Sequence, residues 1–289
     1  MMRGRLTKLQ TPTNGVITQL MALMFFSSIG RGFGAPYVNL YLDSIGVSAT
    51  VIGTIVGIAS LVELAFSPFL NNLADRYKRH RLLLIFQYAA FALGTFLVAM
   101  TTNIWFLGLI VMLIELGKRS AIVLSLQLTL IRLEQINRDI IGRMRAVNAF
   151  GFSLSNMFQG PIFLASGFLG MFMISGIFTG MSIWFMRVLP KQATTQKNDQ
   201  SLAPRQRKFY FLVLIQVFVM LGQRSGFAFW LIHFTNNLGV YVEDIGILIA
   251  IWAFAEVPFF VLFDSIIRRF DVRITYILGA SGMGVMWFL

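Results

Sequence analysis

The sequence predicts an all-α integral membrane protein with about eight complete transmembrane helices and part of a ninth. Hydrophobic residues make up 57% of its 289 residues and charged residues only 12%, whereas a soluble domain usually carries about 25% charged residues. The apolar residues form blocks of about 20 or more, the length at which a helix crosses roughly 30 Å of hydrocarbon. The blocks are apolar all round, without the alternation that barrel strands show.

The apolar blocks place the transmembrane helices in order along the chain. We expect spans over 15–43, 48–70, 82–100, 104–127, 146–166, 168–188, 209–236 and 242–263. A ninth apolar run starts near Thr275 and reaches Leu289 after fifteen residues, which is too short to cross a bilayer. We therefore expect the whole protein to be longer and its C-terminal half to be truncated here. The first block is too long for a signal peptide and is expected to remain as a helix.

One long polar segment, Lys191 to Lys208, interrupts the apolar blocks. Its composition predicts a flexible cytoplasmic linker. The linker divides the chain into an N-terminal six-helix bundle, residues 1–190, and an incomplete C-terminal bundle, residues 209–289.

Lysine and arginine occur in alternate loops. They precede the first span, follow every second span and surround the linker, whereas the turns near Asp43, Thr101–Asn103, Gly167 and 236–244 contain none. This asymmetry predicts a multi-pass protein of the cell membrane whose N-terminus and basic loops face the cytoplasm. It also accounts for the net charge of +12, so we expect no nucleic-acid partner.

The sequence offers few groups for enzymatic chemistry. The chain has no cysteine, which excludes disulfides, thiolate metal sites and cysteine nucleophiles. Its two histidines, His80 and His233, are too few and too far apart for a metal cluster. Hydrolase and metalloprotease motifs such as HExxH and GxSxG are absent. We therefore expect neither an enzyme nor a cofactor or metal site.

An internal repeat relates the two ends of the chain. With an offset of 193 residues, 16–81 align with 209–274 without a gap. Charged residues within spans are rare, so their recurrence in register indicates a genuine repeat. The recurring pairs are Arg31 with Arg224, Glu63 with Glu256, Arg76 with Arg269, Gly46-Val47 with Gly239-Val240, and Ile52-Gly53 with Ile245-Gly246. An even number of spans lies between the copies, which predicts two parallel halves.

The segment after the second span, NNLADRYKRHR from Asn71 to Arg81, resembles the signature of the major facilitator superfamily. The matching residues are Leu73, Ala74, Asp75, Arg76, Arg79 and Arg81, whereas Asn71 and Lys78 replace the two glycines of the signature. DSIIRRFDVR, which follows the eighth span, is a degenerate copy. The resemblance implies a twelve-helix transporter built from parallel six-helix repeats. It also implies that Asp75, Arg76 and Arg79 latch the two halves in one conformation.

Seven charged residues are expected within spans: Arg31, Glu63, Glu115, Lys118, Arg119, Arg224 and Glu256. Each lies about fifteen residues from an end of its span, or roughly 20 Å along a helix. A charge near the midplane costs about 2.5–3.5 kcal/mol on insertion scales, so each should face a partner or a watery cavity. We expect these residues to line the substrate cavity, with arginines attracting an anionic group and glutamates carrying protons.

Structural interpretations of the same charges stay open. Arg31–Glu63 and Arg224–Glu256 can be ion pairs that tie neighbouring helices within each half. Glu115, Lys118 and Arg119 share one helical face, which predicts either a local pair or a cavity lining. Gly30 to Gly34, GRGFG, is expected to provide close packing and a kink before Pro36 rather than a nucleotide loop.

The expected function is alternating-access transport of a small molecule, coupled to protons, by a monomer in the lipid bilayer. Gly160-Pro161 resembles a remnant of the superfamily's export motif and, with the many aromatic residues, favours export of a drug or amphipathic compound. The two arginines favour the alternative, uptake of an organic anion or sugar. The sequence leans to export. A non-transporting receptor or scaffold is a minor alternative that would not need matching charges in both halves.

Overall fold

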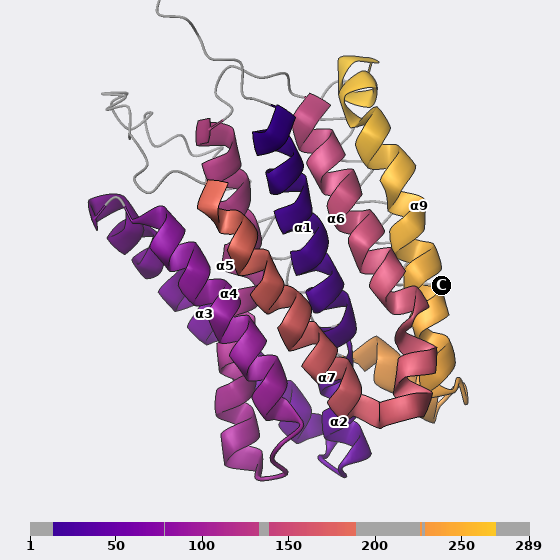
Figure 1. The fold of residues 1–289 in the computed structure, drawn as a ribbon. Helices are drawn as coiled ribbons and strands as arrows, with labels where there is room; N and C mark the ends of the chain where they lie inside the picture. Colours follow the sequence, from indigo (N-terminus) through magenta and orange to yellow (C-terminus); the bar gives the residue numbers. More distant parts are fainter. Residues whose placement is uncertain (1–13, 78, 133–138, 189–225, 227–228, 270–289) are drawn as a thin grey trace, which may run out of the picture.

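The computed structural model describes residues 14–77, 79–132, 139–188, 226 and 229–269, and all regular structure within them is helical (Figure 1). Residues 229–236 form a further helical segment. The labelled helices are α1 (Asn14–Gly34), α2 (Tyr37–Ser44), α3 (Ala49–Tyr77), α4 (His80–Val98), α5 (Ile104–Arg132), α6 (Asp139–Met157), α7 (Gln159–Phe185), η1 (Met186–Val188) and α9 (Val242–Arg269). The linker 191–208, Arg224 and the apolar run after Thr275 lie outside the described residues.

Backbone breaks at Pro36, Phe158 and Gly167 subdivide the apolar blocks. The first block is two helices, α1 and α2, because the proline ring at Pro36 removes a backbone donor and interrupts the hydrogen-bond ladder. The expected kink before Pro36 is therefore confirmed. Within α7, Gly167 has φ 61° and divides the helix at the position of the expected turn. Glycine has no Cβ and adopts this left-handed conformation without strain.

Several helices extend beyond their apolar blocks. α3 runs to Tyr77, so the first part of the signature segment is helical rather than loop. α6 begins at Asp139, seven residues before the expected start of its span at 146. A hydropathy boundary marks where polar residues begin, whereas the helix itself continues through them into the region beyond the hydrocarbon.

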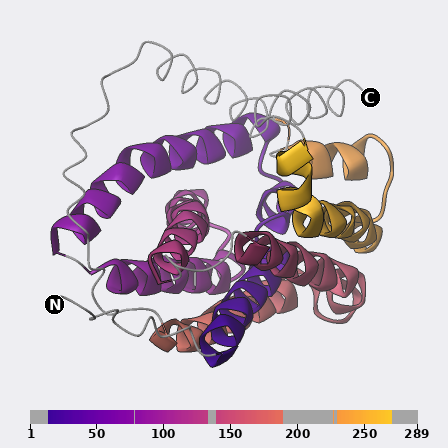
Figure 2. The same cartoon turned by 90° about the horizontal axis from the view of Figure 1, so that it is seen from above.

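The described helices pack side by side in the order α9, α6, α1, α7, α4, α5 and α3. Figure 2 looks along the bundle and shows α1, α6 and α9 as neighbours at one side. Within the part of the chain that the structure describes, four apolar stretches are long enough to cross a membrane: Ala49–Phe66, His80–Val98, Gln159–Phe185 and Val242–Leu262. Large apolar side chains cover the bundle surface, including Trp105 (82% exposed) and Trp184 (63% exposed). Such a surface suits lipid rather than water.

The turns of the two halves repeat in detail. Gly46 and Gly239, which are 193 residues apart, both adopt positive φ, at 84° and 67°. The helix after each turn begins with an equivalent backbone bond, from Ile52 N to Ser48 O (3.0 Å) and from Ile245 N to Tyr241 O (3.3 Å). α3 and α9 then run in the same direction (Figure 1). The expected parallel orientation of the repeats is therefore confirmed for these helices.

Candidate functional site

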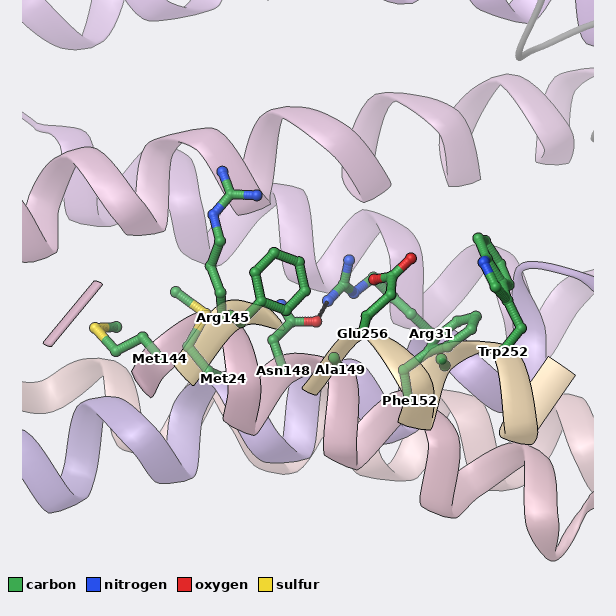
Figure 3. A pocket seen from close by; sticks show the side chains of 11 residues that line it. Met24, Arg31, Met144, Arg145, Asn148, Ala149, Phe152, Trp252 and Glu256 are labelled. Atoms are coloured by element: carbon green, nitrogen blue, oxygen red, sulfur yellow. Dashed lines mark hydrogen bonds between the residues drawn. The ribbon is translucent and has the colours of Figure 1, made fainter. Parts of the chain in front are cut away.

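A pocket of about 370 Å³ lies between α1, α6 and α9, and so between the two halves of the repeat. Most of its lining is apolar or aromatic, and it contains two arginines, one glutamate and one asparagine (Figure 3). The lining residues are Met24, Arg31, Met144, Arg145, Asn148, Ala149, Phe152, Trp252, Ala253, Glu256 and Phe260. Its volume falls within the range of small-molecule sites, roughly 300–1,000 Å³.

Glycines position Arg31 at the wall of this pocket. A Cβ at Gly30 would overlap the hydroxyl oxygen of Thr179 on α7, and one at Gly32 would overlap the hydroxyl oxygen of Ser155 on α6. α1 therefore approaches both neighbouring helices closely on either side of Arg31. The expectation that this glycine-rich segment serves helix packing is supported, because only glycine fits at these crossings.

The guanidinium of Arg31 is held by two hydrogen bonds. Its Nη2 donates to Oδ1 of Asn148 at 2.9 Å, and its Nε donates to the backbone oxygen of Ser27 at 3.4 Å. The residue is half-buried. Figure 3 shows the Arg31 guanidinium and the Glu256 carboxylate directed into the same space. The site thus joins a cation from the first half to an acid from the second.

α6 and α9 supply the other charged groups. Arg145 is exposed at the pocket rim, with its guanidinium carbon 5.9 Å from the ring centre of Phe260. The helices are held together by a hydrogen bond from Ser153 Oγ to the backbone oxygen of Ala250 (2.8 Å). This bond joins α6 to α9, the two helices that carry Arg145 and Glu256 to one pocket.

The pairing of charges differs from the within-half ion pairs considered from the sequence. Arg31 donates its hydrogen bonds to Ser27 and Asn148 rather than to Glu63, and it shares a pocket with Glu256. Glu63 is buried on α3 and is not among the residues that line this pocket. Arg224, the expected partner of Glu256, lies outside the described residues.

The charges on α5 form a separate group. Glu115 is buried, and its Oε1 accepts a hydrogen bond from Nζ of Lys118 at 2.6 Å, forming an ion pair one turn apart. This is the local pair that the spacing allowed. Neither residue lines the pocket between α1, α6 and α9. The side chain of Arg119 lies outside what the structure describes.

The signature residues lie at the junction of α3 and α4. Arg76 is exposed near the end of α3, and Arg79 is exposed immediately before α4 begins. The side chain of Asp75 lies outside the described part of the structure. The latch role of these residues therefore stays a prediction.

Asn148 and Arg145 are pocket residues that the sequence did not single out. Arg145 was assigned to a cytoplasmic loop because the apolar block starts at 146, but α6 begins at Asp139 and carries Arg145 into the pocket wall. Asn148 is an uncharged polar residue within an apolar block, and only its contact with Arg31 distinguishes it. A polar residue inside a span is the signal that could have identified Asn148, whereas Arg145 lies just before the apolar block and gave no such signal.

Two hydrogen bonds join separate segments of the chain at the turns that follow α2 and precede α9. Asn236 Nδ2 donates to Oδ2 of Asp43 at 3.0 Å, across the two halves and between positions 193 residues apart. Gln159 on α7 donates through Nε2 to the backbone oxygen of Val242 at 3.4 Å. We refer to this part as the closed end.

Two comparisons relate the chain to known proteins. A family model described as the MFS_1 like family matches residues 17–289. Among solved structures, the crystal structure of nucleoside transporter NupG matches with a TM-score of 0.67 and 15% sequence identity, over 89% of this chain and 69% of that one. At this identity the structural likeness concerns the fold alone.

Proposed function

The chain belongs to the MFS_1 like family, as the signature around Arg76 indicated, and on that premise we propose that it carries a small molecule across the cell membrane together with protons, in the direction of uptake. Membership of the family supports the broader class, a multi-pass secondary transporter of the major facilitator type. The proposal adds the site, the coupling ion and the direction.

The observation that carries the proposal is the shared pocket of Arg31 and Glu256. One residue comes from each half of the repeat, and both line the same space. In transporters with repeated halves, the substrate site lies at their interface near the midplane, and rocking of the halves exposes it alternately to the two sides. The contacts of a ligand bound between Arg31 and Glu256 would change when the two halves move against each other.

The closed end gives the proposal a conformational state. The pocket extends along α9 from Trp252 to Phe260, away from the contact between Asp43 and Asn236. With the N-terminus in the cytoplasm, as the lysine and arginine pattern indicates, the closed end faces outward. The arrangement then corresponds to the inward-facing state of an alternating-access cycle.

Proton coupling is assigned to Glu256. It is the one carboxyl group among the described residues of the pocket lining. A carboxylate that alternates between ionised and neutral forms carries one proton per cycle. An ion moving across a membrane potential gains or loses about 2.3 kcal/mol per charge per 100 mV. The membrane potential opposes the entry of an anion, and a proton that moves with the anion cancels its charge. This favours symport for an anionic solute.

Of the two sequence features that favoured export, the remnant motif and the many aromatic residues, the motif at Gly160-Pro161 is explained by packing. A Cβ at Gly160 would lie 2.5 Å from the backbone oxygen of Glu243. α7 and α9 can therefore approach this closely only with glycine at that position. Since Gly160 has this structural cause, the uptake alternative becomes the preferred direction.

The test compares Glu256→Gln with Glu243→Gln, a matched change on the same helix at a position outside the pocket. Proteoliposomes with an internal pH dye are offered labelled organic anions, nucleosides and sugars. We expect the parent and Glu243→Gln to move protons with a solute, and Glu256→Gln to lose proton movement. Proton movement in Glu256→Gln equal to the parent refutes the coupling assignment, and an absence of solute entry in the parent refutes uptake.

A further inference from the structure

We propose that the pocket between α1, α6 and α9 recognises a small organic monoanion with a flat apolar body, whose carboxylate binds Arg31. This inference deepens the proposed function and rests on it. It names the chemical class of the solute and the residue that holds its charged group.

The charge of the described pocket lining favours an anion. Two arginines and one glutamate leave a surplus of one positive charge. A low-dielectric site with an uncompensated charge attracts a ligand of opposite sign. A monoanion brings the total to neutrality, whereas a neutral solute leaves the surplus in place and a cationic solute increases it.

Arg31 offers the geometry that a carboxylate requires. A guanidinium has five N–H donors in a planar fork. The bonds to Asn148 and Ser27 use two of them and fix the orientation of the group. The remaining donors make no hydrogen bond to the residues that the structure describes, and they adjoin the space that Arg31 lines. A preoriented fork of this kind binds carboxylates through two parallel hydrogen bonds.

Arg145 has a different role from Arg31. It is exposed at the rim, where its guanidinium lies over the ring of Phe260. Arg31, which is half-buried and held by two hydrogen bonds, is the cation that meets a ligand inside the pocket, and the exposed Arg145 attracts anions toward the pocket entrance.

The remaining lining suits an apolar body rather than a polyhydroxylated one. Phe152 and Trp252 present aromatic surfaces, and Met24 adds a flexible thioether. Among the uncharged lining residues, Asn148 supplies the side-chain carbonyl, and that oxygen already accepts from Arg31. A sugar or nucleoside would bring several hydroxyl groups with few neutral partners, and unpaired buried polar groups weaken binding.

The experiment uses three ligands of nearly equal size that differ in charge: benzoate, benzamide and benzylamine. Binding to the purified full chain is measured by calorimetry, with uridine as a hydroxyl-rich comparison. We expect benzoate to bind at least tenfold more tightly than the other three. Equal binding of benzamide or uridine overturns the assignment of an anionic ligand.

Substitutions at Arg31 identify the binding residue. Arg31→Gln should weaken benzoate roughly 10- to 100-fold, the range expected for loss of a hydrogen bond to a charged group. Arg31→Lys should give an intermediate loss, because it keeps the charge but not the planar fork. Arg143→Gln removes the same charge from α6 outside the pocket lining and should bind benzoate as the parent does.

The two proposals fail in distinguishable ways. If Arg31→Lys keeps the parent's thermal stability and binds benzoate as tightly as the parent does, the fork is not the binding group and the inference is overturned. If the parent transports another solute but does not discriminate by charge, the transport function stands and the monoanion class is wrong. If the parent binds benzoate with the expected order of variants but moves no solute, the substrate class is supported and the transport proposal fails.

Discussion

Replacing Asn148 by aspartate is the sharpest electrostatic test of the pocket, because the change is isosteric. The new carboxylate keeps the acceptor that holds Arg31, at 2.9 Å in the parent. It also places a negative charge on the opposite side of the guanidinium from a bound anion. The two anionic groups would then lie roughly 6 Å apart, and at an effective dielectric of about 20 their repulsion is about 3 kcal/mol. That energy corresponds to roughly 100-fold weaker binding of benzoate.

The assay is benzoate calorimetry at constant pH with a thermal unfolding scan of each variant. Asn103→Asp adds the same charge in the turn before α5 and keeps the acceptor for the backbone N–H of Trp105. It should bind benzoate like the parent. Combining Asn148→Asp with Glu256→Gln restores the surplus positive charge and should recover most of the lost affinity. Parent-like binding by Asn148→Asp alone refutes the reasoning, as does a double variant no better than the single one.

Two further predictions concern packing and the closed end. Gly160→Ala should lower the stability of the chain by about 1–3 kcal/mol, because its Cβ would lie 2.5 Å from a backbone oxygen of α9. Gly180→Ala, on the same helix with nothing within 4 Å, should leave the stability unchanged. An equal melting temperature for the two variants refutes the packing argument. Asn236→Asp should open the closed end, because two carboxylates that repel each other would replace the 3.0 Å hydrogen bond between Asn236 and Asp43. The chain has no cysteine, so Ala149→Cys adds a single thiol in the pocket wall. A membrane-impermeant maleimide applied outside cells should then react faster with that thiol. With Asp43→Asn, which keeps a donor and an acceptor, the cysteine should react with the maleimide at the parent's rate. If the cysteine reacts as slowly in Asn236→Asp as in the parent, the hydrogen bond between Asp43 and Asn236 does not keep this end closed.

Much of the helical layout follows from the sequence because membrane-length apolar runs have few alternatives. Gly167 and Pro36 interrupt long helices where their backbone properties predict. The parallel repeat also followed from sequence, since rare residues such as Arg31 and Glu256 recur at one offset while the intervening apolar residues carry little information. These features are local or periodic, which is why a single chain reveals them.

The partners within the site could not be derived in the same way. Which face of α1 meets α6 depends on the glycine crossings at Gly30 and Gly32, and no periodic pattern encodes the rotation that results. The sequence left open whether Arg31 pairs with Glu63 or lines a cavity, whereas the structure brings Arg31 to Asn148 and to the pocket of Glu256. Which of several polar residues far apart in the sequence come into contact is decided by tertiary packing.

The exposed tryptophans at opposite ends of the bundle have a consequence for the host bilayer. Trp105 lies in the first turn of α5. Trp184 lies in the last turn of α7, with the guanidinium carbon of Arg187 3.6 Å from its ring centre. Indole rings prefer the headgroup level, so the two residues fix the depth of the N-terminal half in the bilayer. When one half tilts against the other, the two tryptophans must then leave the headgroup layer, or the thickness of the surrounding bilayer must change. Turnover should accordingly depend on lipid chain length, with a maximum where the headgroup layers match the spacing of the two rings.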